Sequence, residues 1–308
     1  MLTSQPVSRA SGCRPATSDV LANTQLTTLI NSSMKKNLDI ETVKSFGDEW
    51  GRFDQTQLSE ADAQKIFDEY FSIFPWNSLP KNATGFDMGC GSGRWAKLMA
   101  PRVGHLHCID PSSALDVARK ALAESPNASF LQASVDDKPL PDGSQDFGYS
   151  LGVLHHVPDT AGAIAACTAL LKPGAPFLLY LYYAFDNRSS AFKMLWLISD
   201  MMRRFICRMP SAVKHVFTDA LAAFAYFPLA RLSLLAERVG MGVSSFPLSH
   251  NRHHSFYTMR TDSRDRFGTP LEQRFTREEI TYMLQAAGLK DVRFSDHAPF
   301  WCAIGIKI

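Results

Sequence analysis

Between Thr84 and Tyr182, short apolar runs alternate with amphipathic segments. Five of the runs have the length of strands: Thr84–Met88, His105–Ile109, Ser129–Ala133, Phe147–Leu151 and Phe177–Tyr182. Helical spacing of apolar residues recurs between them, at Ala114–Ala123 and Ala161–Leu171. Strands that alternate with helices predict an α/β fold whose mainly parallel sheet is covered by helices on both faces.

The alternation stops near Ala184 and resumes near Arg274, so an insertion of roughly ninety residues interrupts the predicted sheet, far longer than an ordinary loop. Thr276 and Glu279 then form a capping-box pattern that predicts a helix to Ala287. Two short apolar runs close the chain, at Val292–Phe294 and Trp301–Ile306. We expect a flexible N-terminal tail at 1–38, a helical cap at 39–80, a ligand-binding core at 81–183, a helical insertion at 184–273 and a C-terminal completion of the sheet at 274–308.

The insertion carries two predicted helices. The first has apolar residues at three- and four-residue spacing and a basic flank that includes Arg203, Arg204 and Arg208. The second covers Val213–Val239 and is expected to break at Pro228. No run in the chain reaches the ~18 uncharged apolar residues that a membrane-spanning helix needs. The 191–240 helices are therefore expected either to touch a membrane surface or to form a lid or the interface of a homodimer.

Composition narrows the class of protein. With 45% hydrophobic and 20% charged residues, the chain has the balance of an ordinary globular protein. The net charge of +2 gives no support to a nucleic-acid partner. The six cysteines form no CxxC pair, which argues against a metal site or a disulfide framework and favours a reducing, cytoplasmic location.

A glycine-rich turn, Asp87-Met88-Gly89-Cys90-Gly91-Ser92-Gly93, follows the first predicted strand. Glycines between a strand and a helix allow positive φ angles and the close approach of a ligand to the backbone. A tight turn without a ligand would have the same composition. A dinucleotide site would read G-x-G-x-x-G, and here the third glycine comes one residue early.

Asp110 ends the next predicted strand, about twenty residues downstream, where a carboxylate can accept hydrogen bonds from the hydroxyls of a ribose. Asp is also a favoured helix N-cap, which is the alternative interpretation. The distance from the glycine turn favours ligand binding.

With these residues in place, the sequence resembles class I S-adenosylmethionine (SAM)-dependent methyltransferases, especially the small-molecule branch that includes ubiquinone and menaquinone biosynthesis enzymes. The resemblance covers about 84–183, and the end of the last helix, Ala287-Gly288-Leu289, matches as well. Five segments carry it, in the family's order: Phe86–Gly93, His107–Ser112, Pro139–Phe147, Leu154–Asp159 and Leu170–Gly174.

The resemblance implies a Rossmann-like, seven-stranded, mainly parallel sheet with an antiparallel last strand and the helical insertion after the fifth strand. It also implies SAM as cofactor and S-adenosylhomocysteine as product. Ser134 stands where the family usually has Asp, so the adenine contact is expected from Ser134 or, in a shifted register, from Asp136. The implied cofactor residues are Asp87, Gly89, Cys90, Gly91, Gly93, Arg94, Asp110, Pro111, Ser134, Val135, Asp136, Leu151 and Gly152.

Histidines supply the candidate general bases, because a neutral imidazole can accept a substrate proton near neutral pH. His155 and His156 follow the fourth strand, although Leu-His-His recurs in the family and these side chains could instead line the site or cap the next helix. The third candidate, His254, belongs to a polar cluster late in the insertion.

That cluster predicts an acceptor pocket for an anionic or hydroxylated substrate, the alternative being a solvated loop. Trp50, ahead of the first strand, could offer an aromatic face to a sulfonium cation or simply pack against a helix. The expected pocket residues are Trp50, His250, His253, Tyr257 and Arg260, and no metal ligands stand out by spacing.

The sequence thus predicts an enzyme that transfers a methyl group from SAM to a small molecule, either lipid-like or a hydroxylated metabolite. A methyltransferase acting on RNA or protein would be expected to carry a basic groove. A noncatalytic SAM-fold binding protein is the other alternative.

Overall fold

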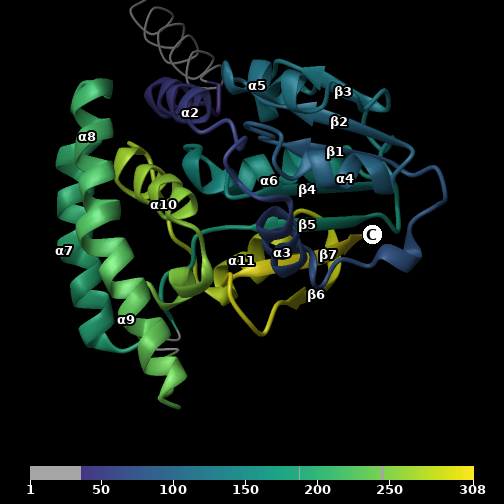
Figure 1. Cartoon of the computed structure of the whole chain (residues 1–308). Helices are drawn as coiled ribbons and strands as arrows, with labels where there is room; N and C mark the ends of the chain where they lie inside the picture. Colours follow the sequence, from purple (N-terminus) through teal and green to yellow (C-terminus); the bar gives the residue numbers. More distant parts are fainter. Residues whose placement is uncertain (1–35, 187, 244–245) are drawn as a thin grey trace, which may run out of the picture. The chain divides into compact units, whose positions relative to one another are not determined.

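The computed structural model describes residues 36–186, 188–243 and 246–308, and Asn37–Ile308 form one unit. The predicted tail at 1–38 lies almost wholly outside the described residues. A seven-stranded sheet has the order β3-β2-β1-β4-β5-β7-β6, with β7 antiparallel to β5 and β6 and the other pairs parallel (Figure 1). The predicted sheet is confirmed. Its strands are β1 Thr84–Met88, β2 His105–Ile109, β3 Ala128–Leu131, β4 Phe147–Leu151, β5 Pro176–Tyr180, β6 Leu289–Phe294 and β7 Cys302–Lys307.

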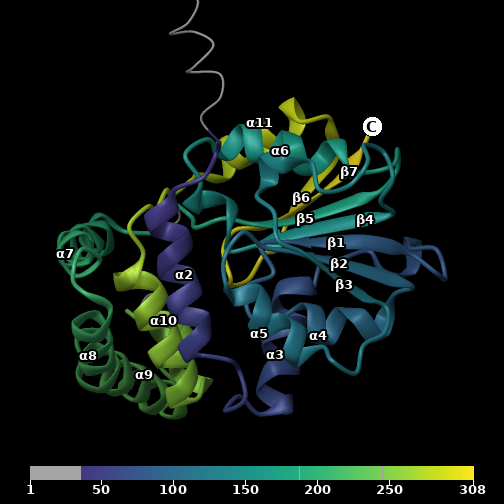
Figure 2. The same ribbon diagram turned by 90° about the horizontal axis from the view of Figure 1, so that it is seen from above.

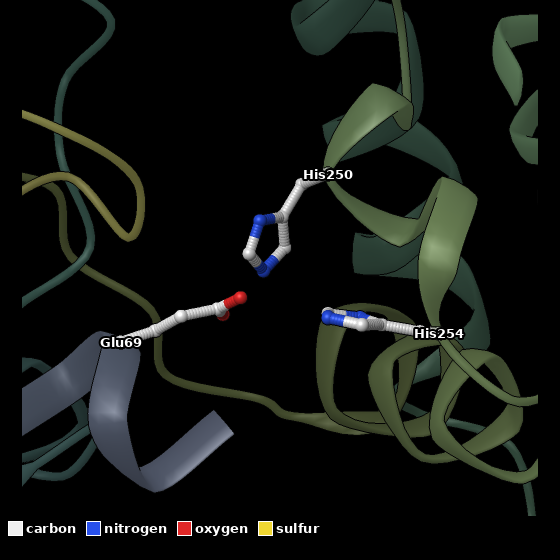
Figure 3. Close-up of side chains that lie close together, drawn as sticks. All are labelled: Glu69, His250 and His254. Atoms are coloured by element: carbon white, nitrogen blue, oxygen red, sulfur yellow. The ribbon is translucent and has the colours of Figure 1, made fainter. Parts of the chain in front are cut away.

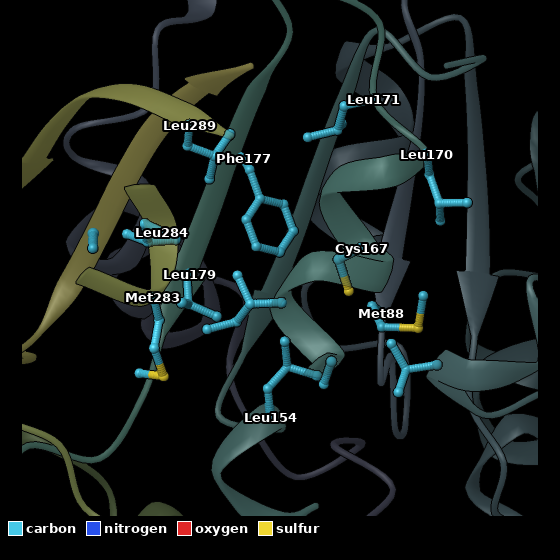
Figure 4. Close-up of a cluster of buried hydrophobic side chains, with 14 of the residues drawn as sticks. Met88, Leu154, Cys167, Leu170, Leu171, Phe177, Leu179, Met283, Leu284 and Leu289 are labelled. Carbon is cyan, nitrogen blue, oxygen red and sulfur yellow. The ribbon is translucent and has the colours of Figure 1, made fainter. Parts of the chain in front are cut away.

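Helices cover both faces of the sheet (Figure 2). One face carries α6 (Thr160–Ala169) and α11 (Arg277–Ala286), and the other carries α3 (Glu60–Phe71), α4 (Ala96–Met99) and α5 (Ala114–Ala121). Alternate side chains of one strand enter opposite cores, since Phe177 and Leu179 pack beneath α6 and α11 while Leu178 packs on the other side. Figure 4 shows the first of these cores, with Phe177 between β5 and α6. The burial of both sheet faces explains why these strands are continuous apolar runs in the sequence.

The insertion forms a helical layer beside the sheet. It contains α7 (Ser190–Ile206), α8 (Ser211–Leu221), α9 (Phe227–Arg238) and α10 (Phe256–Gly268), and α10 packs against α7, α8 and the N-terminal helix α2 (Ile40–Arg52) (Figure 2). Sequence periodicity did not predict α10, whose Ser255 N-cap accepts a hydrogen bond from the Thr258 backbone. The remaining short turns are η1 Trp76–Ser78, η2 Ala100–Arg102, η3 Val135–Asp137, η4 Leu154–His156, η5 Ala222–Tyr226 and η6 Ser249–His253.

The second predicted helix of the insertion is not broken at Pro228. A π-helical turn at Ala222–Tyr226 precedes the proline at the start of α9, and this local change of hydrogen bonding accommodates the missing N–H without ending the helix. The result is one continuous helix, Ser211–Arg238, with an 18-residue window of mean hydropathy 1.3 and 22% of that window buried. By length and composition alone it could cross a membrane, although Asp219 and Arg231 limit its uncharged apolar run to Ala220–Ala230, as expected from the sequence.

Ion pairs link the helices of the insertion to one another and to α2. Asp219 on α8 accepts hydrogen bonds from Arg52 of α2 at 2.6 Å and from Arg260 of α10 at 3.1 Å. Arg203, predicted on a basic flank, is instead buried, where it pairs with Asp200 at 2.7 Å and donates to the Thr269 carbonyl. The prediction was wrong for Arg203 because carbonyls at the end of α10 and the Asp200 carboxylate replace its water.

Candidate functional site

A cavity of about 650 Å³ lies at the carboxyl ends of the central strands, between the glycine turn and the insertion. The parallel strands β2, β1, β4 and β5 all end there. From β1 the chain adds β2 and β3 on one side of the sheet and then crosses to add β4 and β5 on the other. This is the position at which open α/β sheets bind ligands. Side chains of α2, α7 and α10 complete the wall, so the predicted core and insertion share one cavity.

The glycine turn forms part of the wall through Gly89, Cys90 and Gly91. Gly89 has φ 80° and Gly91 has φ 53°, in the region that favours glycine, and a Cβ on Gly91 would lie 3.0 Å from Trp50 Nε1. Gly93 does not reach the cavity, because it packs on α5, where a Cβ would meet Leu122 at 2.7 Å. Its φ of 79° therefore serves the packing of the turn against α5.

Two aspartates lie at the ends of β1 and β2. Asp110 lines the cavity, and its carboxylate accepts hydrogen bonds from the Gly91 backbone and from Ser112 N and Oγ, at 2.8, 2.8 and 2.6 Å. Asp87 is fully buried beneath the turn, and burial raises the pKa of its carboxyl to about 8. Asp110 therefore binds the glycine turn and also lines the cavity. Pro111 lines the cavity as well.

The three residues predicted to flank adenine do not line the cavity. Ser134 and Asp137 form a capping box with each other's backbone, and Val135 packs in the core beneath α6. Asp136 accepts a hydrogen bond from the Asn37 backbone. In the segment after β3, Ser134 and Asp137 therefore cap the turn η3, and Val135 packs in the core. The position of these residues in the sequence did not predict this.

The predicted methionine end comes together more fully. Leu151, Gly152, Arg94 and Trp50 all line the cavity. A Cβ on Gly152, whose φ is 79°, would meet nothing nearer than Tyr180 at 3.9 Å among the described residues, so this glycine keeps the wall open. The Arg94 guanidinium lies 4.1 Å from the ring centroid of Trp95 and 6.0 Å from that of Trp50.

The two adjacent histidines have different surroundings. His155 is fully buried, does not line the cavity and lies against Tyr182, with ring centroids 3.9 Å apart. Burial holds the pKa of His155 well below its ordinary value. His156 lines the cavity, and its Nδ1 lies 2.6 Å from the Leu271 carbonyl oxygen. The geometry brings His156, and not His155, to the candidate site.

His156 Nδ1 must carry the proton, because a carbonyl can only accept. Its Nε2 is buried and has no hydrogen-bond partner among the described residues. Burial lowers the pKa of His156, with Asp265 opposing that effect, so the ring is neutral near pH 7 with a free lone pair on Nε2.

The late polar cluster is divided. His250 and His254 line the cavity, with ring centroids 4.7 Å apart. His253, Tyr257 and Arg260 do not line it. His253 pairs with Glu237 at 3.0 Å, the Tyr257 hydroxyl accepts from the Gln55 backbone, and Arg260 binds Asp219. The solvated-loop alternative was wrong, because the segment forms η6 and α10.

Sequence reasoning missed several polar residues of the wall. Tyr182 follows β5 and donates a hydrogen bond to Asp265 on α10, and both line the cavity. Asp262, one turn earlier, accepts from Asn251, and burial raises the pKa of Asp262 to about 6. In the sequence, only the i, i+3 spacing of Asp262 and Asp265 indicates that they share a helix face. That inference can be made only if 256–268 is already known to be helical.

Comparisons with known proteins agree with this geometry. A family model described as "Methyltransferase domain" matches residues 86–179, which run from β1 into β5. Ubiquinone biosynthesis O-methyltransferase from Hahella chejuensis is 30% identical over 165 residues, 50% of this chain and 64% of that protein. The enzyme of the same name from Thiobacillus denitrificans is 34% identical over 181 residues, 58% of this chain and 72% of that protein.

The solved structure of an O-methyltransferase family protein from Burkholderia thailandensis has a TM-score of 0.51 at 13% identity, and the match covers 94% of this chain and 71% of that one. It supports the fold alone. The match to the Hahella relative spans less than two-thirds of that protein, and one to the Serratia proteamaculans enzyme of the same name spans 53%. The family model and the Thiobacillus match agree with the strand order of the sheet. The chain therefore belongs to the class I SAM-dependent methyltransferases.

Proposed function

We propose that the chain transfers a methyl group from SAM to an oxygen atom of a small hydroxylated acceptor. One observation carries the proposal: a single cavity extends from Asp110 and the glycine turn to His156 and the insertion. Cofactor and acceptor would therefore occupy the same cavity, as direct transfer requires. The names of the relatives from Hahella and Thiobacillus support an oxygen acceptor.

The cavity residues fit SAM. Asp110 offers a carboxylate at the cavity wall beside the glycine turn, which suits the ribose hydroxyls. The open space at Gly152 leaves room that a Cβ would fill, which suits the methionine end. Trp50 and Arg94 face the same region from α2 and from the turn.

SAM, when bound, supplies an electrophilic methyl group on a sulfonium sulfur, and the new bond to oxygen forms as the methyl–sulfur bond breaks. The chain's own residues orient the acceptor and remove its proton. His156 Nε2 accepts the hydroxyl proton, while Leu271 holds the ring through Nδ1–H and Asp265 stabilises the resulting imidazolium. Helices α2, α7 and α10 restrict the access of water.

The insertion gives the cavity an apolar end. Phe192, Leu195 and Met202 of α7 line it together with Tyr226 and Leu229, so a lipid-like tail on the acceptor would find apolar contacts there. The outer side of the same helices is also apolar, since Met201, Phe205 and Phe224 are exposed. These faces support contact with a membrane surface that supplies such an acceptor.

The RNA or protein alternative has less support. The cavity wall contains Asp262 and Asp265 as well as Arg94 and Arg274, which does not amount to the basic groove that a nucleic acid needs. The Nε2 atom of His156, which lines the cavity and has no hydrogen-bond partner in the described part of the chain, favours an enzyme over a noncatalytic binding protein.

Two measurements test the proposal. Calorimetry with SAM and with S-adenosylhomocysteine should show binding of both, and failure to bind either would refute it. Incubation with methyl-labelled SAM and a series of alkyl-substituted catechols should then label the acceptor, with higher activity on long-chain members. Cofactor binding without turnover on any hydroxylated acceptor would favour the noncatalytic alternative.

A further inference from the structure

Three potential metal ligands from distant parts of the sequence meet beside the cavity. Glu69 comes from α3, whereas His250 and His254 come from η6 and the residue after it. One ligand atom from each side chain lies within 4.8 Å of the other two. Figure 3 shows the carboxylate and both imidazole rings directed toward a common space.

These groups have unmet hydrogen-bonding capacity. Glu69 Oε2 and both ring nitrogens of His254 are buried and have no hydrogen-bond partner among the described residues. His254 is only 7% exposed. Buried polar atoms are normally paired, so these atoms remain available to contact a ligand in the space between them.

The donor atoms suit a transition-metal cation. Imidazole nitrogens and carboxylate oxygens are ligand atoms that Zn²⁺ and related ions accept. Glu69 supplies the negative charge. The positive charge of Lys65 acts on all three side chains, and that of Arg252 acts on Glu69 and His250. A metal ion that keeps the anionic Glu69 carboxylate as a ligand would be compatible with both cations.

The backbone around the histidines is held in place. Arg231 of α9 donates to the Arg252 and His254 carbonyls at 2.9 and 3.3 Å. Arg252 bridges the Ser249 carbonyl and Glu237 at 2.7 and 2.8 Å. The two imidazoles are therefore presented by a fixed turn, which reduces the ordering that metal binding requires.

We propose that Glu69, His250 and His254 bind a divalent transition-metal ion, with Zn²⁺ as the reference ion. Two imidazoles and one carboxylate form the ligand set of catalytic zinc sites, which keep a further position open. His250 and His254 line the cavity, so the open position faces it. The sequence-based expectation of no metal site rested on spacing within the chain, and Glu69 lies far from both histidines in sequence.

The open position would take an oxygen atom of the acceptor. This second part rests on the proposed function, whereas metal binding itself does not. A metal at this wall would orient a hydroxylated or carboxylated acceptor and would lower the pKa of a bound hydroxyl group.

The test is calorimetric titration of ZnCl₂ into the chelator-treated full-length protein and into Glu69→Gln, His250→Ala and His254→Ala variants. Loss of one ligand should weaken the affinity of this site by more than the roughly 10- to 100-fold that loss of an outer-shell group costs. His253→Ala is the matched control, because His253 is adjacent in sequence but pairs with Glu237. Comparison with the wild type separates this site from Zn²⁺ bound by the cysteines.

Circular dichroism and S-adenosylhomocysteine binding confirm that each variant is folded. Substitution of Co²⁺ should give ligand-field absorption in the wild type and His253→Ala but not in His254→Ala. Equal Zn²⁺ affinity in the wild type and all three ligand variants would overturn the proposal, even if the cofactor binds normally. Failure of cofactor binding with Zn²⁺ binding intact would overturn the methyltransferase proposal alone.

Discussion

His156 Nδ1 lies 2.6 Å from the carbonyl oxygen of Leu271, so the end of the insertion orients a histidine that follows the central strand β4. The contact fixes the tautomer, because the Nδ1 proton must point to the carbonyl and Nε2 must be the acceptor. It also explains how an insertion can control chemistry that takes place at the core strands.

Substitution His156→Asn should therefore remove the base and keep the orienting contact. An asparagine amide can still donate to Leu271, but it has no basic nitrogen at the position of Nε2. We expect kcat to fall by about 10²- to 10⁴-fold, the usual contribution of a general base. Affinity for S-adenosylhomocysteine, measured by calorimetry, should stay the same.

The pH profile gives an independent check. Burial holds the folded pKa of His156 below 6.5, so Nε2 remains unprotonated as the pH falls through that value. The acid limb of the kcat profile should therefore lie below pH 6.5 in the wild type and be absent in His156→Asn. An acid limb that persists in the variant would assign the base elsewhere.

Asp110 gives the second prediction. Its carboxylate is the acceptor available at the cavity wall for ribose hydroxyls, and charge-assisted hydrogen bonds contribute about 1.5–3 kcal/mol each. Asp110→Ala should weaken S-adenosylhomocysteine binding at least about 10-fold. Asp136→Ala is the informative comparison, since the cavity does not reach Asp136. Equal losses in both variants would mean that the cofactor extends over the segment after β3.

Much of the fold and half of the site were predictable because the signals are local. The apolar runs of β1 to β5 are buried on both faces, and the glycines of the turn need φ values that few other residues adopt. The position of Asp110 at the cavity wall follows from its place directly after β2. Each of these signals is contained within a few consecutive residues.

The unpredicted half depends on contacts between distant segments. His155 and His156 are adjacent in sequence, yet one packs against Tyr182 and the other faces the cavity. Arg203 is buried only because Asp200 and the end of α10 meet it. Such outcomes depend on which helices pack together, and periodicity within one segment does not contain that information.

Gly152 gives a third prediction with a close control. Both Gly152 and Gly174 have positive φ, 79° and 84°, and at either position an added Cβ would have no close neighbour in the described part of the chain. An alanine at either position should cost about 1–2 kcal/mol of stability from backbone strain. Only Gly152→Ala should also weaken S-adenosylhomocysteine binding, since only Gly152 lines the cavity. Similar affinities in the two variants would exclude Gly152 from the cofactor site.

Glu49 on α2 predicts a pH dependence of stability. It is fully buried, and neither carboxylate oxygen has a hydrogen-bond partner among the described residues. Burial, reinforced by Asp265, raises the pKa of Glu49 well above 4.5. The folded state therefore holds this proton more tightly than the unfolded state does. The resulting stability is present below pH 4.5 and is lost as the pH rises through the folded pKa.

Glu49→Gln removes that titration and keeps the shape of the side chain. Its stability relative to the wild type should rise as the pH increases above 4.5, as measured by thermal unfolding at several pH values. Other titrating groups are common to both proteins and cancel in the difference. A difference that stays constant with pH, or falls as the pH rises, would show that Glu49 is ionised in the folded protein.

The exposed faces of α7 and of the 211–238 helix give the last prediction. Met201 is 73% exposed, Phe205 69% and Phe224 84%, and the basic side chain of Arg204 is exposed beside them. Transfer of one such apolar side chain from water contributes about 1.5–3 kcal/mol. Replacing Phe205 or Phe224 with serine should therefore lower partitioning onto phosphatidylglycerol-containing vesicles by about 10-fold or more.

Tyr282→Ser is the control, because Tyr282 is 74% exposed but lies on α11, away from the insertion. Flotation of the wild type and the three variants with anionic vesicles measures the partitioning. A second copy of the chain covering the same face would instead make sedimentation depend on concentration, and the serine variants would shift that equilibrium in the absence of lipid. Binding that is lost equally in Tyr282→Ser would mean that the apolar faces of the insertion do not direct it. Retained binding in both phenylalanine variants would leave charge as the cause, since Arg204 and its neighbours attract anionic lipid without insertion of side chains.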